Sequence, residues 1–65
     1  KKIKMVIKFI TTSEEGSVEI IKETSTLTTV TPQIGWCIVI KQEQYFVDMI
    51  EMNYDNGIIS INLIK

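Results

Sequence analysis

The stretch that decides the fold runs from residue 45 to residue 64 and reads YFVDMIEMNYDNGIISINLI. It consists of two apolar segments joined at Asn56-Gly57. Asn-Gly is the strongest short signal for a tight hairpin, because both residues accept the positive φ of a type I′ turn. A two-residue loop would pair the apolar residues on one face: Tyr54 with Ile59, Met52 with Ile61 and Ile50 with Leu63. The turn and the apolar pattern therefore predict the same antiparallel hairpin.

The segment before this hairpin, residues 36–41, reads WCIVIK and predicts another strand, which a short polar connection joins to Tyr45. A tight turn around Gln42-Glu43 would pair Ile40 with Tyr45, Ile38 with Val47 and Trp36 with Met49. In that register the apolar stripe of the longer strand changes sides near Met49 and Ile50. A bulge in the middle of a strand has this effect, and small closed barrels depend on such bends.

The N-terminal half supplies the remaining strands. Residues 2–10 alternate between apolar and mostly polar positions, which predicts a strand with one face in the core, and the polar residues 11–17 predict a loop. Residues 18–30 allow two interpretations: a long bent strand with a bulge near Ile21-Lys22, or a short helix within residues 17–24. The strand is favoured because the Ser- and Thr-rich continuation has poor helix propensity. Pro32 and Gly35 then indicate a turn.

The composition supports a β structure. The chain of 65 residues contains 13 Ile and 5 Val but no Ala, and β-branched side chains fit a pleated sheet better than a helix. We therefore expect one all-β domain over residues 1–65, a small five-stranded antiparallel and strongly bent barrel of the SH3-like or OB-like kind. The alternative is a flat meander that forms a homodimer through its second apolar face.

The residue types argue against catalysis. The chain has no His and a single Cys, so it can form neither an imidazole-based catalytic triad nor a disulfide within itself, and a closed zinc site is not expected. Cys37 lies in an apolar strand, where a structural role is expected. We predict a protein that is not an enzyme and that needs no metal or cofactor. No apolar run approaches the ~20 residues of a membrane span, and a cytoplasmic location is expected.

Apolar residues occur on both faces of the middle strands, which indicates a surface for a partner. Trp and Tyr are favoured interface anchors. Asp48 lies between Val47 and Met49, and the predicted register places it beside Cys37; it is expected to be a bulge residue that points to water or a polar anchor in a binding face. The predicted partner-binding residues are Trp36, Tyr45, Val47, Asp48 and Met49.

A basic stripe lies on the first predicted strand and is formed by Lys1, Lys2, Lys4 and Lys8. Together with the aromatic residues it could form an OB-like platform on which bases of single-stranded nucleic acid stack. However, the net charge is −1 and the chain has no Arg. Lysines on an edge strand also protect against aggregation. Nucleic acid is therefore the less favoured partner.

One pattern resembles small phage-encoded β proteins. A Pro-x-x-Gly turn, Pro32 to Gly35, enters the apolar strand of residues 36–40, and Tyr-x-Val-x-x-Ile follows from Tyr45 to Ile50. In such proteins Asp often follows the Gly, whereas Trp36 stands there in this chain. The resemblance implies an accessory protein of a mobile element, a group that includes virion components and inhibitors of host defence proteins. It implies no catalytic or binding residues.

Three functional hypotheses follow. The first is a non-catalytic protein-interaction module, such as a phage or mobile-element inhibitor that occludes a host defence or regulatory protein in the host cytoplasm. The second is a self-assembling structural or virion subunit, whose surplus apolar face is covered by copies of itself in a homo-oligomer. The third is an OB-like binder of nucleic acid or of a small ligand.

Overall fold

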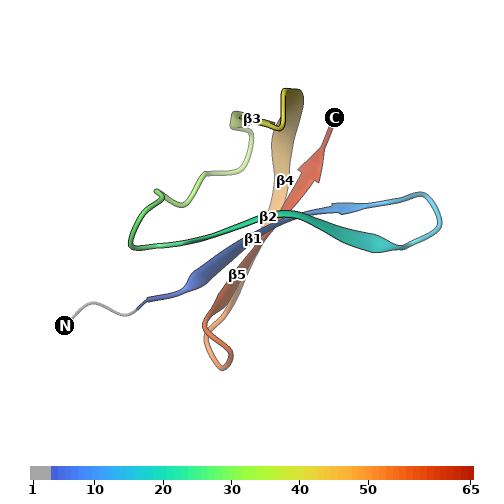
Figure 1. The fold of residues 1–65 in the computed structure, drawn as a ribbon. Helices are drawn as coiled ribbons and strands as arrows, with labels where there is room; N and C mark the ends of the chain where they lie inside the picture. Colours follow the sequence, from blue (N-terminus) through green and yellow to red (C-terminus); the bar gives the residue numbers. More distant parts are fainter. Residues whose placement is uncertain (1–3) are drawn as a thin grey trace.

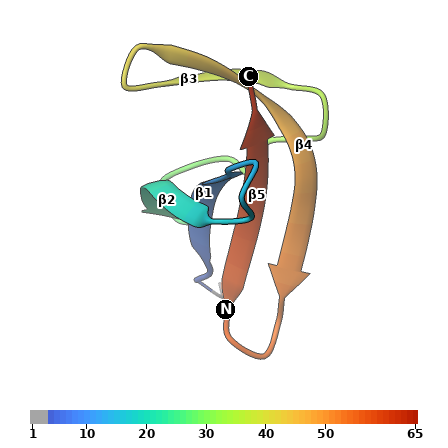
Figure 2. The ribbon, with the colours of Figure 1, turned by 90° about the vertical axis from the view of Figure 1, so that its right-hand side faces the viewer.

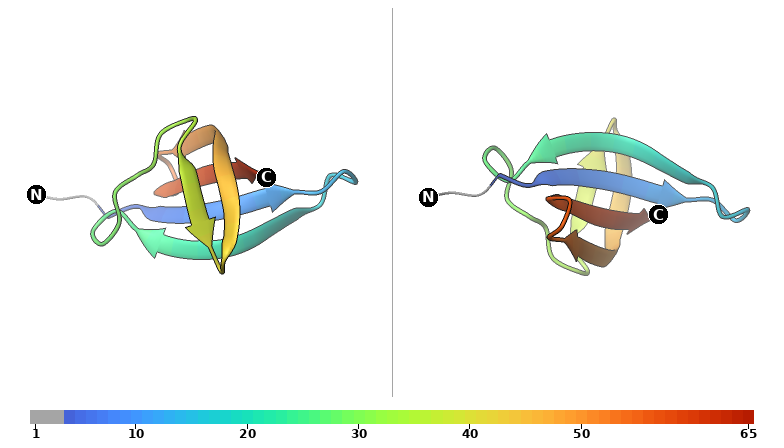
Figure 3. Two further views of the ribbon diagram at one scale, coloured as in Figure 1. Left: turned by 90° about the horizontal axis from the view of Figure 1, so that it is seen from above. Right: turned by 90° about the horizontal axis from the view of Figure 1, so that it is seen from below.

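The fold is a single curled sheet. The computed structural model describes residues 4–65, and these form five strands: β1 (Val6–Thr12), β2 (Val18–Ser25), β3 (Cys37–Ile40), β4 (Glu43–Asn53) and β5 (Ile58–Ile64). They pair in the order β2-β1-β5-β4-β3. The sheet curls into a half-barrel, in which the β3–β4 hairpin crosses over β1 and β2 (Figures 1 and 3). The prediction of a small, bent, all-β barrel of five strands is thus confirmed.

One of the four strand pairings differs from the antiparallel prediction. The pairings β1–β2, β3–β4 and β4–β5 are antiparallel, whereas β1 and β5 are parallel. The chain forms a hairpin at its N-terminal end and a three-stranded meander at its C-terminal end, and these two units join along their first and last strands. Hairpins fix the direction of sequence neighbours. No turn joins β1 to β5, so the sequence pattern carries no signal for their relative direction.

The β4–β5 hairpin forms as predicted but in a register shifted by two residues. Ile50 pairs with Ile61 and Met52 with Ile59, so the loop consists of the four residues 54–57. The side-chain Oδ1 of Asn53 accepts a hydrogen bond from the backbone N–H of Asn56 at 3.1 Å, which supports this wider turn. A shift of two residues leaves every side chain on its original face. The predicted core face is therefore correct, although the predicted pairs are wrong.

The type I′ conformation occurs instead at Lys41-Gln42, between β3 and β4. Both residues have positive φ, 54° and 69°, and they form a two-residue loop because Ile40 pairs with Glu43. The turn lies one residue before the predicted Gln42-Glu43 turn, so Ile38 pairs with Tyr45 and not with Val47. Positive φ is unfavourable for residues with a Cβ. This turn is therefore held by the strands on either side of it.

This strain yields a testable prediction. Gln42→Gly is expected to raise the free energy of unfolding by about 1 kcal/mol, because glycine adopts positive φ without the steric cost. Urea denaturation followed by circular dichroism measures the change. Gly57→Ala is the converse variant: Gly57 has φ 68° and no heavy atom lies within 4 Å of an added Cβ, so only backbone strain opposes it. A stabilising Gly57→Ala or a destabilising Gln42→Gly would contradict the turn geometry.

Two bulges bend the sheet. Along β4 the register shifts between Val47 and Met49, so Asp48 is the extra residue of a bulge. A bulge position was one of the two roles predicted for Asp48. Along β2 the shift leaves Ile21 unpaired between Ile20 and Lys22, and residues 18–25 form a strand and not a helix. Bulges increase local twist and bend the strand. Figure 2 shows the resulting curvature of β4.

The core lies on the concave face of the half-barrel. It consists of eight buried side chains from β1, β3, β4 and β5: Ile7, Phe9, Ile40, Tyr45, Val47, Ile59, Ile61 and Leu63. Among the described residues no polar or charged side chain is buried. The edge strand β2 contributes only the partly buried Ile21 to this cluster. The concave face is consequently well filled in the middle of the sheet and poorly filled beside its edges.

Candidate functional site

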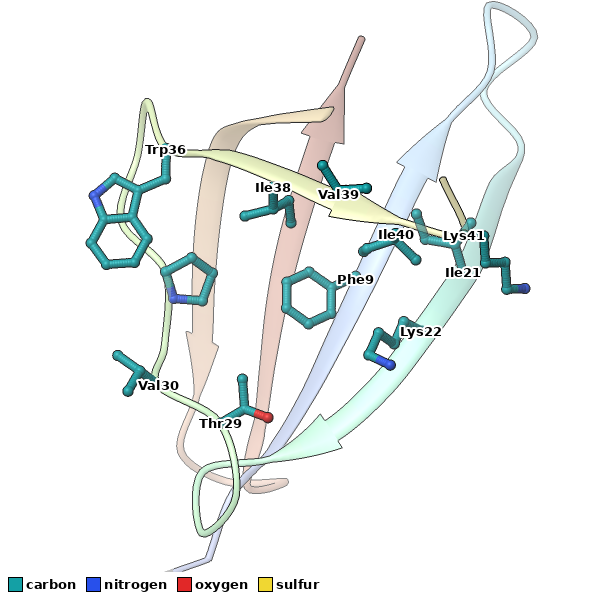
Figure 4. Close-up of a pocket in the computed structure, with 11 residues that line it drawn as sticks. Phe9, Ile21, Lys22, Thr29, Val30, Trp36, Ile38, Val39, Ile40 and Lys41 are labelled. Atoms are coloured by element: carbon teal, nitrogen blue, oxygen red, sulfur yellow. The ribbon is translucent and has the colours of Figure 1, made fainter. Parts of the chain in front are cut away.

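An apolar groove lies where the half-barrel is left open, between the edge strands β2 and β3. Its volume is about 340 Å³. Figure 4 shows β3 along one side, β2 along another, and the connection between these two strands along a third. The lining residues are Phe9, Ile21, Lys22, Thr29, Val30, Pro32, Trp36, Ile38, Val39, Ile40 and Lys41. Hereafter "the groove" refers to this set.

The connection between β2 and β3, residues 26–36, is attached to the sheet at both ends. Near its start, Thr26 exchanges two hydrogen bonds with the backbone of Met5, at 2.9 and 3.0 Å. Near its end, Gly35 N–H donates to the Val47 carbonyl and Val47 N–H donates to the Trp36 carbonyl, both at 2.9 Å. The connection contains no helix or strand, but these bonds fix where it forms the wall of the groove.

Trp36 is the largest side chain of the groove. Because its backbone pairs with that of the buried Val47, Trp36 lies on the concave side of the sheet, yet 48% of it remains exposed. Val30 is also exposed, and both line the same end of the groove (Figure 4). Exposed aromatic and aliphatic groups in a concave site are typical of ligand and partner pockets. This end of the groove can therefore take an apolar side chain.

Of residues 4–65, Lys22 and Lys41 are the only charged ones that line the groove. Both are exposed, and no carboxylate is among the lining residues. In Figure 4 they lie on the side of the groove away from Trp36 and Val30. The groove therefore has an apolar end and a cationic end.

The five predicted partner-binding residues do not form one surface. Tyr45 and Val47 belong to the core, with exposed fractions of 8% and 3%. Trp36 lies in the groove, whereas Met49 lies on the convex face, because its partner Asn62 stands between the buried Ile61 and Leu63. Asp48 is exposed at the bulge. Of the predicted set, only Trp36 lines the groove.

Cys37 and Asp48 are not neighbours, which corrects the predicted register. Cys37 pairs with Phe46, and its Sγ accepts a hydrogen bond from Nε2 of Gln44 at 2.9 Å. The thiol is exposed on the convex face. The shift of two residues in the β3–β4 register accounts for the difference, because it moves Asp48 beyond the end of β3.

Apart from Trp36, the prediction omitted every residue of the groove, among them Ile21, Lys22, Val30 and Lys41. The break in alternation at Ile21 was a usable signal, since it marked the bulge that turns this residue towards the groove. Val30 was a second signal, as an apolar residue among Ser and Thr in a segment without periodicity. Lys22 and Lys41 carry no local signal, because only the curl of the sheet brings them to one site.

A second apolar surface lies on the convex face. It is formed by Phe46, Met49 and Ile64, together with Cys37 on the neighbouring strand, and we call it the convex patch. Phe46 pairs directly with both Cys37 and Ile64. No charged residue belongs to this patch. Since it lies on the opposite face from the groove, it provides control positions for experiments on the groove.

An ion pair joins the end of the chain to β4. The Lys65 ammonium bonds to the Glu43 carboxylate and lies 5.7 Å from the centroid of the Tyr45 ring. The hydrogen bond from Lys65, followed by its charge, holds the pKa of Glu43 below its ordinary value of 4.5. The pair thus stabilises the fold above about pH 4.5 and ceases to do so as the pH falls through the lowered pKa. Both side chains are exposed, so its contribution is small.

The basic stripe is partly balanced by acidic residues. Lys8 pairs across the sheet with Glu23, while Lys1 and Lys2 lie outside the described residues. The aromatic side chains also do not form one open surface: Trp36 lies in the groove, Phe46 lies on the opposite, convex face, and Tyr45 is buried in the core. A stacking platform needs several aromatic rings on one open surface. The groove is accordingly the better candidate site.

Within residues 4–65 no three His, Cys, Asp or Glu side chains gather in a way that could hold a metal ion. The same part of the chain contains no helix that could cross a membrane. No protein-family model, curated protein or solved structure matches the chain.

Proposed function

We propose that the protein is a non-catalytic interaction module that holds a short extended segment of another protein in the groove. The observation that carries this proposal is the position of the groove, an apolar hollow between two strand edges with a half-exposed Trp36 at one end. A partner segment held in the groove would be covered and so withheld from other contacts, and occlusion is therefore the mechanism that we propose. A phage or mobile-element inhibitor is the biological form of this function that the sequence resemblance implies.

The edge of β3 supplies hydrogen-bonding groups for an extended segment. Ile40 and Glu43 flank a two-residue turn and therefore form a hydrogen-bonded pair. Antiparallel pairs alternate, so the backbone groups of Cys37 and Val39 point away from β4. An added strand can bond to them, as in other complexes formed by strand addition. Backbone bonds of this kind give affinity, and the groove gives specificity.

Trp36 is the expected anchor of the interface. Half of its surface is exposed beside Val30, so a bound apolar side chain would be enclosed between them. Interface tryptophans are frequent hot spots, and their truncation costs about 2 kcal/mol or more, which is roughly thirtyfold in affinity. Since Trp36 is not a core residue, this loss is expected without loss of the fold.

A selection from a random peptide library tests the proposal. The wild-type protein is expected to enrich peptides that bind equally well to Met49→Ala, a variant of the convex patch, and at least tenfold more weakly to Trp36→Ala. Circular dichroism confirms that both variants fold. The proposal would be refuted if no peptide were enriched, or if the enriched peptides bound Trp36→Ala as tightly as the wild type.

A further inference from the structure

We infer that the groove selects segments with an apolar part at one end and acidic residues at the other. This inference rests on the proposed function and names the chemistry of its partner. It follows from the separation, within one groove, of Trp36 and Val30 from Lys22 and Lys41.

The two lysines of the groove carry uncompensated charge. Lys65–Glu43 is the only ion pair formed by residues 4–65, so neither Lys22 nor Lys41 is neutralised. The acidic residues nearest to them in sequence do not face the groove freely: Glu23 stands opposite Lys8 on the convex side of the sheet, and Glu43 bonds to Lys65. A carboxylate from a partner would therefore find two ammonium groups without a competing anion.

The backbone fixes the position of this cationic end. Lys41 lies in the two-residue turn and has a φ of 54°. A two-residue hairpin loop allows few other backbone conformations. Lys22 follows the bulge residue Ile21, in the part of β2 that lines the groove. Long lysine side chains keep freedom at their ends, but the Cα atom of Lys22 is held by pairing with Phe9 and that of Lys41 by the turn. Charge at this end is thus a built-in property of the groove.

The charge also disfavours a second copy bound groove to groove. A two-fold arrangement packs the same patch of both copies together. The lysines at positions 22 and 41 of both copies would then share one interface to which the groove contributes no carboxylate, and like charges in one interface are unfavourable. A foreign segment with acidic residues matches the site better, and the open edge of β3 favours a protein segment over a small amphiphile.

The test compares the charge of the peptides that two protein variants select from the same library. The wild-type protein is expected to enrich peptides with Asp or Glu at one end, and Lys22→Glu/Lys41→Glu is expected to enrich peptides with Lys or Arg there. Lys4→Glu/Lys8→Glu changes the net charge equally but lies outside the groove, so it should select the wild-type set. Exposed ion pairs contribute little free energy, so we expect the acidic peptides to bind Lys22→Glu/Lys41→Glu about tenfold more weakly than the wild type. Their binding to the wild-type protein is also expected to weaken at high salt.

Other outcomes would overturn this inference, either alone or together with the proposed function. Enrichment of apolar peptides without charge preference would overturn this inference and leave the proposed function intact. Absence of any enrichment would overturn both. Decanoate, titrated against the fluorescence of Trp36, serves as the small-amphiphile probe: if it bound in a manner dependent on Lys22 and Lys41 while no peptide did, the occupant would be a small molecule and not a protein segment.

Discussion

Ile61→Ala is expected to lower the free energy of unfolding by about 3–4 kcal/mol, the usual cost of a large cavity in a core. Ile61 is fully buried, with an exposed fraction of 0%. It lies in β5 and pairs with Phe9 on one side and with Ile50 on the other, so no neighbour can move freely into the vacated space. A domain of this length is stable by only about 3–10 kcal/mol, and the variant is expected to be largely unfolded at 37 °C.

Ile64→Ala is the matched control, with the same substitution in the same strand. Ile64 lies on the convex patch with 48% of its surface exposed, and we expect a loss of about 1 kcal/mol or less. Urea denaturation of both variants gives the comparison. Equal losses for the two variants would contradict the assignment of the concave face as the core.

Tyr45→Ala is expected to cost about 3–5 kcal/mol of stability, as is usual for a buried aromatic residue. The neighbouring Phe46→Ala should cost much less, because Phe46 is 41% exposed on the convex patch. Successive side chains of a strand point to opposite faces of the sheet. The comparison therefore tests which of these adjacent aromatic residues lies on the concave face.

Tyr45→Phe separates the ring from the hydroxyl. It keeps the ring in the core and below the Lys65 ammonium, so its stability is expected to stay close to that of the wild type. If Tyr45→Ala instead reduced peptide binding while leaving the unfolding transition unchanged, Tyr45 would be an interface residue, as the sequence alone had suggested, and the core assignment would be wrong.

The positions of Tyr45 and Met49 in the structure show what strand patterns can and cannot predict. Alternation and turn signals identified the strands, the core face of β5 and both bulges. They left the register uncertain by two residues, because a shift of two keeps every side chain on its face and so leaves the apolar pattern unchanged. The turn chemistry was misleading in detail: Asn56-Gly57 lies in a four-residue loop, while Lys41-Gln42 adopts positive φ without a favourable sequence.

The sequence predicted the candidate site less well than the fold. Trp36 was predicted because apolar residues occur on both faces of the middle strands and Trp is a favoured interface anchor. Tyr45 and Val47 were assigned to the same surface because the sequence cannot say which apolar face of a bent strand is enclosed. Lys22 lies on β2 and Lys41 in the turn after β3; these two strands share no pairing, and only the curl of the half-barrel brings both lysines to the groove.

We propose that the groove, and not the convex patch, binds the partner. A titration of isotope-labelled protein with an enriched peptide, followed by amide and indole chemical shifts in NMR spectra, distinguishes the two surfaces. We expect the largest changes at Ile21, Lys22, Lys41 and the Trp36 indole, with little change at Met49 and Ile64. Changes concentrated at Phe46, Met49 and Ile64 would place the partner on the convex patch and overturn the proposal.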